Sequence, residues 1–211
     1  MAILPKALPV RKSWDTAILV LLFAVIVMAS LTTEGFLTAL NFSYIFSNTS
    51  EIMIIAFAML FLIILGEIDL SVASILALSS SMLGWSYVRG APIWLAIIIC
   101  LVVGTLCGFI NGFLVTKLGL GSLAVTIGTL ALYRGIANGM LNENTVNEFP
   151  DFWTSFGFDT FGTSFMPKTM PMIIIFAIIF GLLLHRTPFG RRTLAIGQSP
   201  EAARFAGINV V

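Results

Sequence analysis

The sequence has few charged residues. Lys, Arg, Asp and Glu make up only 10% of the 211 residues, whereas an ordinary globular domain has about 25%. Hydrophobic residues account for 58%, and the mean hydropathy is +1.03. No soluble core of this size needs so many apolar residues, which argues against a water-soluble domain. The formal net charge is +1, so the chain also lacks the basic excess typical of a nucleic-acid-binding protein.

Cysteine and histidine are scarce as well. Cys100 and Cys107 lie seven residues apart in one apolar run, too far apart to bridge each other within a helix, and we expect two buried thiols. The single histidine, His185, has no partner for metal binding. We therefore expect neither a disulfide framework nor a metal site. There is no G-x-x-x-x-G-K-[S/T] run and no convincing nucleophile–base pair, so we expect no nucleotide or other cofactor on this chain and no enzymatic activity.

The sequence contains long apolar runs instead. Six of them approach the roughly 20 residues that an α-helix needs to cross a bilayer. The runs are continuous rather than alternating, which disfavours a membrane β-barrel. We therefore predict an all-α fold, a polytopic bundle of about six transmembrane helices. The expected spans are 14–31, 44–65, 71–88, 92–116, 120–141 and 169–184.

The basic residues predict the orientation in the membrane. A cytoplasmic N-terminus places eight basic residues inside and two, Arg89 and Lys168, outside, as the positive-inside rule requires. The eight are Lys6, Arg11, Lys12, Lys117, Arg186, Arg191, Arg192 and Arg204. The basic start followed by an apolar run also fits a signal peptide, but no cleavage pattern clearly closes the run. We favour a retained first helix.

The stretch 66–71, Gly-Glu-Ile-Asp-Leu-Ser, places two carboxylates between two apolar runs. Acids at such a position are costly unless they are solvated, paired or part of a helix cap. One interpretation is a helix break, in which Gly66 ends one helix and Asp69 or Ser71 caps the next. The other is a polar element that lines a substrate path. The two interpretations are compatible.

The fourth and fifth predicted spans contain further polar residues. Asn111 either bonds across helices or lines a path. The hydroxyls of Thr126 and Thr129 are expected to bond the carbonyl four residues earlier. Arg134 either extends its side chain to the outer interface or pairs with a carboxylate or a sugar hydroxyl. Three glycines spaced by four residues predict a helix-packing seam: Gly104, Gly108 and Gly112.

The one long outer connection, 142–168, is rich in aromatic residues. They are Phe149, Phe152, Trp153, Phe156, Phe158, Phe161 and Phe165. Because aromatic residues favour the membrane interface, one interpretation is an amphipathic segment lying on the bilayer. A docking face for an external partner is the other. The outer connections are also acidic, with Glu34, Glu143, Glu148, Asp151 and Asp159.

After residue 185 the sequence becomes polar and basic. Within it we predict a short helix, with Ser199 as N-cap, Pro200 at the first helical position and Gly207 after its end. A capped helix that exposes Arg204 and Phe205 to the cytoplasm suits contact with a soluble partner. The alternative is an amphipathic helix that rests on the membrane.

Several segments, taken in chain order, resemble one family. The pattern Glu-Ala-Ala-x-x-x-Gly at 201–207 looks like the EAA loop of ABC importer permeases. The segment 66–72 resembles the G-G-I-D-L-S-V-G signature of ribose/xylose/rhamnose-type sugar permeases. Segments 108–112, 126–135 and 187–191 also look like that family. Glu67 and Ala73 stand where the family usually or often has glycine, which leaves the particular sugar open.

The resemblance implies the permease subunit of an ABC importer that moves a monosaccharide inward across the bacterial cytoplasmic (inner) membrane. It implies a cytoplasmic ATPase that uses ATP, a periplasmic or lipid-anchored sugar-binding protein, a second permease subunit and membrane lipid as partners. Residues 1–185 would be the membrane region and 186–211 a cytoplasmic coupling segment. Family members have about ten spans, so the chain resembles the N-terminal part of a permease, without the C-terminal spans.

Two sets of functional residues follow from these interpretations. The substrate path would contain Glu67, Asp69, Ser71, Asn111, Thr126, Thr129 and Arg134, because a neutral polyol needs hydroxyl, amide and charged groups along a wet path. ATPase coupling would involve Ser199, Glu201, Ala202, Ala203, Arg204, Phe205 and Gly207. Two other functions stay open: an ion-coupled secondary transporter that uses Glu67 and Asp69, and a non-transporting scaffold subunit.

Overall fold

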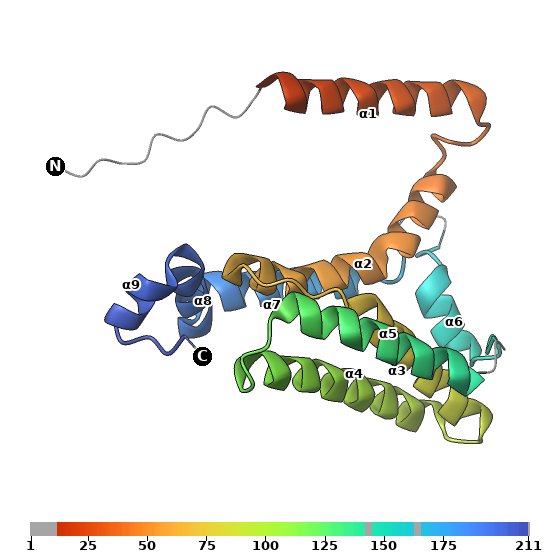
Figure 1. Ribbon diagram of the computed structural model, residues 1–211. Helices are drawn as coiled ribbons and strands as arrows, with labels where there is room; N and C mark the ends of the chain where they lie inside the picture. The colour runs from red at the N-terminus through yellow and green to blue at the C-terminus, as the bar shows by residue number, and fades with distance from the viewer. Residues whose placement is uncertain (1–11, 142–144, 163–165, 211) are drawn as a thin grey trace.

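The computed structural model shows an almost entirely helical chain (Figure 1). It describes residues 12–141, 145–162 and 166–210, and Lys6, Arg11, Glu143 and Phe165 lie outside this part. Within it, the only β pairing is a single bridge between Thr160 and Pro167. The helices are α1 (Lys12–Thr32), α2 (Ala39–Leu65), α3 (Val72–Val88), α4 (Ile93–Thr116), α5 (Ser122–Leu141), α6 (Asp151–Phe158), α7 (Met170–Arg186), α8 (Pro188–Gln198) and α9 (Pro200–Phe205). The predicted all-α class is confirmed.

Each of the six predicted spans coincides with one helix, α1 to α5 or α7. Three stretches are long and apolar enough to cross a membrane: Trp14–Thr32, Ala39–Leu65 and Ile93–Thr116. A fourth is obtained if α7 and α8, which meet at a 69° bend, are taken as one broken span. α3 is apolar but has only 17 residues. The number of six spans therefore stays a prediction.

One group of helices packs around α3, which lies against both α4 and α5. Their shared core contains Leu78 from α3, Cys107 from α4, and Tyr133 and Ala137 from α5. The last two are four residues apart and therefore lie on the same face of α5. Because Tyr133 and Ala137 are buried, this face of α5 points toward α3 and α4. We call α3, α4 and α5 the first helix group.

A second group consists of α2, α7 and α8, with α9 packed on α8. Phenylalanine rings tie it together. The Phe180 ring of α7 has its centroid 6.2 Å from Phe57 and 5.9 Å from Phe61, both in α2. Phe61 also meets Phe189 of α8 at 5.6 Å. Ring pairs at these separations add to the apolar burial that holds helices together.

α1 lies apart from both groups. Figure 1 shows it running beside the bundle, joined to α2 by a turn. None of the window Trp14–Thr32 is buried inside the structure. The apolar side chains of α1 therefore face outward on all sides, as in a helix surrounded by lipid or by other protein.

Three helices end at a glycine with positive φ: Gly66 at +77°, Gly90 at +91° and Gly207 at +78°. In each case the N–H groups of the glycine and of the next residue donate to carbonyls of the last helical turn, over 2.9–3.1 Å. This double bond pattern is the Schellman motif, which favours glycine at the left-handed position. The predicted ends at Gly66 and Gly207 are confirmed.

The two ends of the bundle differ. In Figure 1, α8 and α9 lie at one end and α6 at the opposite end. The long aromatic connection contains α6, which exposes Phe152 and Phe158 by about 70% each. Phe149 packs on Tyr87 with ring centroids 5.3 Å apart. Membrane-interface contact and partner docking stay open as interpretations of this surface.

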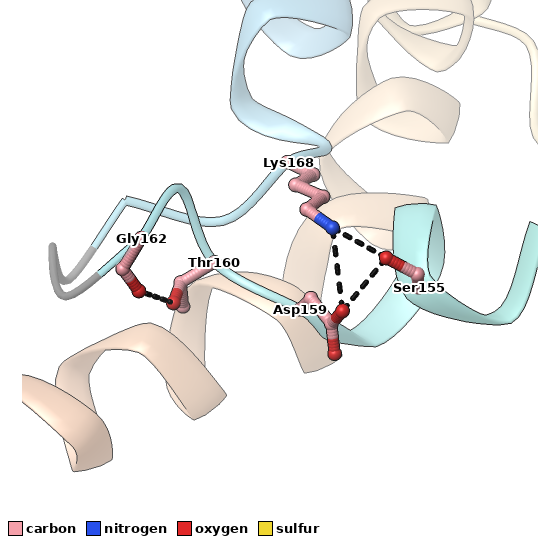
Figure 2. Close-up of polar contacts among 5 residues, drawn as sticks. All are labelled: Ser155, Asp159, Thr160, Gly162 and Lys168. Carbon is pink, nitrogen blue, oxygen red and sulfur yellow. Dashed lines mark hydrogen bonds and ion pairs between the residues drawn. The ribbon is translucent and has the colours of Figure 1, made fainter. Parts of the chain in front are cut away.

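A small polar clamp fixes α6 to the start of α7 (Figure 2). The Lys168 ammonium group lies 3.3 Å from the Asp159 carboxylate and also donates to the Ser155 hydroxyl, which in turn donates to Asp159 over 2.7 Å. Hydrogen bonds from Ser155 and Lys168 lower the pKa of the Asp159 carboxyl below its usual value. The clamp orients the aromatic helix relative to α7.

Candidate functional site

The 66–71 loop leaves α2 at Gly66 and enters α3 after Ser71. The Oδ1 atom of Asp69 accepts the backbone N–H of Ser71 over 2.8 Å and its hydroxyl over 2.6 Å. A carboxylate that accepts the N–H two residues later forms an Asx turn. Ser71 occupies the N-cap position, but its side chain makes no cap bond. Of the two predicted caps, Ser71 forms no side-chain cap bond, because its hydroxyl is engaged by Asp69 and Asn111, whereas Asp69 accepts the N–H of the N-cap residue itself.

Asn111 connects this loop to the first helix group. Its Nδ2 atom donates to the Ser71 hydroxyl over 2.7 Å, and its Oδ1 atom accepts from the Tyr133 hydroxyl at 3.3 Å. Tyr133 also reaches the carbonyl of Cys107 at 3.3 Å. Ser71 is fully buried and Asn111 is 5% exposed. Each polar group thus has a partner, as a buried network requires.

α5 supplies a second anchor. The Ser122 hydroxyl accepts the N–H of Ile68 at 3.5 Å, and the Thr126 hydroxyl reaches the Ile68 carbonyl at 3.4 Å. Thr126 and Thr129 also bond the carbonyls four residues earlier, at 2.8 and 3.0 Å, as predicted. The loop from Ile68 to Ser71 is therefore fixed to the first helix group.

The structure brings together four of the predicted path residues, Asp69, Ser71, Asn111 and Thr126, in this network. Thr129 is buried one turn further along α5. Glu67 and Arg134 are exposed and lie outside the network. The arrangement joins helices through satisfied hydrogen bonds, which agrees with the structural interpretation of the 66–71 loop. Tyr133 and Ser122 also belong to the network, although the sequence did not predict them as site residues.

The glycines of α4 are not equivalent. A Cβ at Gly104 would lie 3.1 Å from the Ser79 hydroxyl of α3, so Gly104 allows close packing of these helices. A Cβ at Gly108 or Gly112 would meet no atom within 4 Å. Of these three glycines, Gly104 is thus the one at which the structure supports the predicted close packing of α4 on α3. Packing at Gly108 and Gly112 stays a prediction.

The coupling segment contains one more helix than predicted. Thr187 caps α8 by accepting the N–H of Gly190 at 3.2 Å, and Pro188 occupies the first helical turn. This Thr-Pro pair was the overlooked signal for a helix start. Ser199 caps α9 through the N–H of Ala202, also at 3.2 Å, as predicted.

The side chains of α9 divide into two sets. Ala203 is only 3% exposed, whereas Phe205 is 93% exposed. Glu201, Ala202 and Arg204 are exposed as well. Ala203 therefore holds the helix in place, and the exposed residues form the surface available to a partner. We call Glu201, Ala202, Arg204 and Phe205 the α9 surface.

A protein-family profile described as "Branched-chain amino acid transport system / permease component" matches residues 41–211. The chain belongs to this permease family. Its apolar helices agree with a multi-pass membrane protein. The matched region includes the 66–71 loop, the Asn111 network and the α9 surface.

Named relatives have similar sequences. The Autoinducer 2 import system permease protein LsrD of Klebsiella pneumoniae is 34% identical over 206 residues, which cover 95% of this chain and 61% of the relative. The Ribose import permease protein RbsC of Bacillus subtilis is 36% identical over 192 residues, which cover 90% and 59%. This permease thus spans about three fifths of the length of these relatives. No solved structure matches it.

Proposed function

We propose that the chain is the membrane-spanning permease subunit of an ABC importer that moves a monosaccharide inward across the bacterial cytoplasmic membrane. The names of its relatives support a small polar cargo, since they refer to import systems for ribose and autoinducer 2. Its proposed partners are a cytoplasmic ATPase, a periplasmic or lipid-anchored sugar-binding protein, a second permease subunit and lipid. The ATPase would use the ATP, and this chain would bind no nucleotide.

The α9 surface carries this proposal. A 93% exposed phenylalanine on a helix capped at both ends is costly to leave in water and suits insertion into a partner. In Figure 1, α9 lies at the same end of the molecule as α8, the end of α7 and the turn between α4 and α5. These segments contain Arg191, Arg186 and Lys117, so the positive-inside rule assigns this end to the cytoplasm. We therefore propose the α9 surface as the ATPase contact.

The path residues have different proposed roles. Glu67 and Arg134 keep exposed side chains and are candidates for contact with the cargo. The 66–71 loop would be held in place by Asp69, Ser71, Asn111 and the turn of α5 from Thr126 to Thr129. Use of Asp69 in the Asx turn argues against a proton relay, and so against the secondary-transporter alternative.

The test is Phe205→Ala in the full-length permease, expressed with its ATPase and binding protein. We expect the variant to insert normally, because the ring contributes little to the fold, but to lose ATPase co-purification and sugar uptake. Phe158→Ala is the matched control, since that ring is 71% exposed at the opposite end. Normal uptake by Phe205→Ala, with the ATPase still bound, would contradict the proposal.

A further inference from the structure

α8 touches the ends of two membrane helices at very close range. A Cβ at Gly197 would overlap the carbonyl oxygen of Ile64 in α2 and lie 3.0 Å from its carbonyl carbon. Near the other end of α8, a Cβ at Gly190 would overlap the carbonyl oxygen of Leu184 in α7. Only glycine allows such an approach of one backbone to another. With its packing on Phe61, α8 forms one unit with α2 and α7.

Four residues after Ile64, the chain is attached to the other helix group. Ile68 is held by Ser122 and Thr126 of α5, and the loop continues into the Asn111 network. Between these attachments lies Gly66, whose Cβ position has no atom within 4 Å. The short stretch 65–67 is therefore the connection between the two helix groups at this end.

The two groups are otherwise weakly joined. Within the described residues, no helix of α3–α5 makes more than marginal contact with α2, α7 or α8. A groove of about 540 Å³ separates them, with Ile55 and Phe180 on one side and Ile75 and Leu101 on the other. A mainly apolar groove between two well-packed units offers little resistance to relative movement, which is the geometry of a hinge.

We propose that Gly197 is the residue through which movement of α9 reaches α2, and that the stretch 65–67 is the hinge about which α2, α7 and α8 move relative to α3, α4 and α5. Gly197 is a positioning residue, because it acts on the Ile64 backbone and touches neither cargo nor ATPase. The inference rests on the proposed function, since it needs an ATPase bound to the α9 surface.

Distance measurements test the movement without changing Gly197. The full-length complex is reconstituted in lipid with Cys100 and Cys107 replaced by Ala. Spin labels at Ile63 and Gln198 report the α2–α8 distance, and labels at Ile63 and Ile110 report the α2–α4 distance. All three labelled positions are exposed.

Addition of Mg-ATP should leave the α2–α8 distance unchanged and shift the α2–α4 distance. A shift between α2 and α8, or an unchanged α2–α4 distance in a complex that transports, would overturn the inference.

Substitution of Gly197, the residue that makes the contact with Ile64, gives a second test. Gly197→Ala should leave ATPase co-purification intact, because the α9 surface is unchanged, but should lower sugar uptake per ATP hydrolysed several-fold. Gly181→Ala in α7 is the control, since its Cβ would meet no atom within 4 Å, and should behave as wild type. Wild-type coupling in Gly197→Ala would overturn the inference while leaving the proposed function standing. Failure of the unmodified permease to bind an ATPase would overturn both.

Discussion

Asn111 uses both ends of its amide to join three helices. One end donates to Ser71 at the start of α3, and the other accepts from Tyr133 of α5. At a site this buried, water cannot take the place of a hydrogen-bond partner that is lost. Its removal leaves unsatisfied polar groups on two other helices, which is costly in a low-dielectric interior.

Asn111→Ala should therefore destabilise the fold. We expect a loss of about 1–2 kcal/mol in the free energy of unfolding, the range for buried hydrogen bonds between membrane helices. Chemical unfolding in detergent micelles measures it. Thr116→Ala on the same helix is the control, because its exposed hydroxyl only bonds the carbonyl of Gly112. Equal stabilities of the two variants would argue against the network.

Asp159 gives a pH dependence with a defined sign. Its pKa in the folded protein is lowered by Ser155 and Lys168. A lowered pKa means that the carboxylate stabilises the clamp at and above the ordinary aspartate pKa of about 3.9. This contribution is lost as the pH falls through the folded value. The clamp should thus be insensitive to pH near neutrality and weaken only in acid.

Fluorescence of Trp153 can follow the clamp in a variant with Trp14, Trp85 and Trp94 replaced by Phe. We expect a constant spectrum from neutral pH down to about 5 and a change below about pH 4. Asp159→Asn should show the altered spectrum at every pH. A transition near pH 6 would instead indicate a histidine or another group.

The neighbours Tyr133 and Arg134 show what the sequence reveals at the scale of residues. Arg134 attracts attention because it is charged in an apolar run, but it lies about 100° around α5 from Tyr133 and outside the network. Tyr133 resembles an ordinary core aromatic, so its hydroxyl contact with Asn111 was not predicted. Asp69 and Asn111 were predicted as polar site residues because a carboxylate or an amide is conspicuous in or beside an apolar run, and Ser71 because it belongs to the same short stretch as Asp69.

At the scale of elements, the end of α2 depends on the left-handed conformation of Gly66. Gly66→Ala should cost about 1–2 kcal/mol, because a Cβ is disfavoured at positive φ even in open space. Gly66→Asn should cost less, since asparagine tolerates this region. Thermal unfolding in micelles would show the order wild type, Asn, Ala.

Gly128→Ala in α5 provides the contrasting control. This glycine is helical and its Cβ would meet no atom within 4 Å. The substitution should be neutral or stabilise by up to about 1 kcal/mol, because glycine is unfavourable inside a helix. Equal losses in Gly66→Ala and Gly128→Ala would contradict the assigned role of Gly66.

α9 could be predicted to within one residue of its observed boundaries, whereas α8 was missed. Ser199, Pro200 and Gly207 mark α9 with three local signals that need no tertiary contact. α8 has a local signal too, at Thr187 and Pro188, but its glycines and basic residues read as a loop. Its helical state is supported by packing against α2 and α7, which a single sequence does not display.

At the scale of the whole molecule, the proposed topology places α8 and α6 on opposite sides of a membrane. In a variant with Cys100 and Cys107 replaced by Ala, a cysteine at Phe161 should react with a maleimide that cannot cross the cytoplasmic membrane. The label is added to intact cells whose outer membrane, if present, has been made permeable to it. A cysteine at Gln198 should react only after permeabilisation. Labelling of Gln198 from outside would contradict the orientation and remove the proposed ATPase contact from the cytoplasm.

Helix positions follow from the apolar runs, and the predicted orientation follows from the basic residues, but the division into two helix groups follows from neither. The helices α1 to α5 and α7 are apolar on most of their faces, so periodicity does not tell which faces meet. The pairing of α2 with α7 joins segments more than 100 residues apart through phenylalanine contacts. Such pairing depends on side-chain shape across the bundle rather than on any local pattern.

The turns that end the three glycine-terminated helices contain no ionisable group among their closing hydrogen bonds. Their closing hydrogen bonds run from backbone to backbone, so no proton uptake or added salt weakens them directly. The turn between α3 and α4, which contains Gly90, lies at the opposite end of the bundle from α9 and the end of α2. These reversals should therefore keep the same shape in two compartments that differ in acidity and ionic strength.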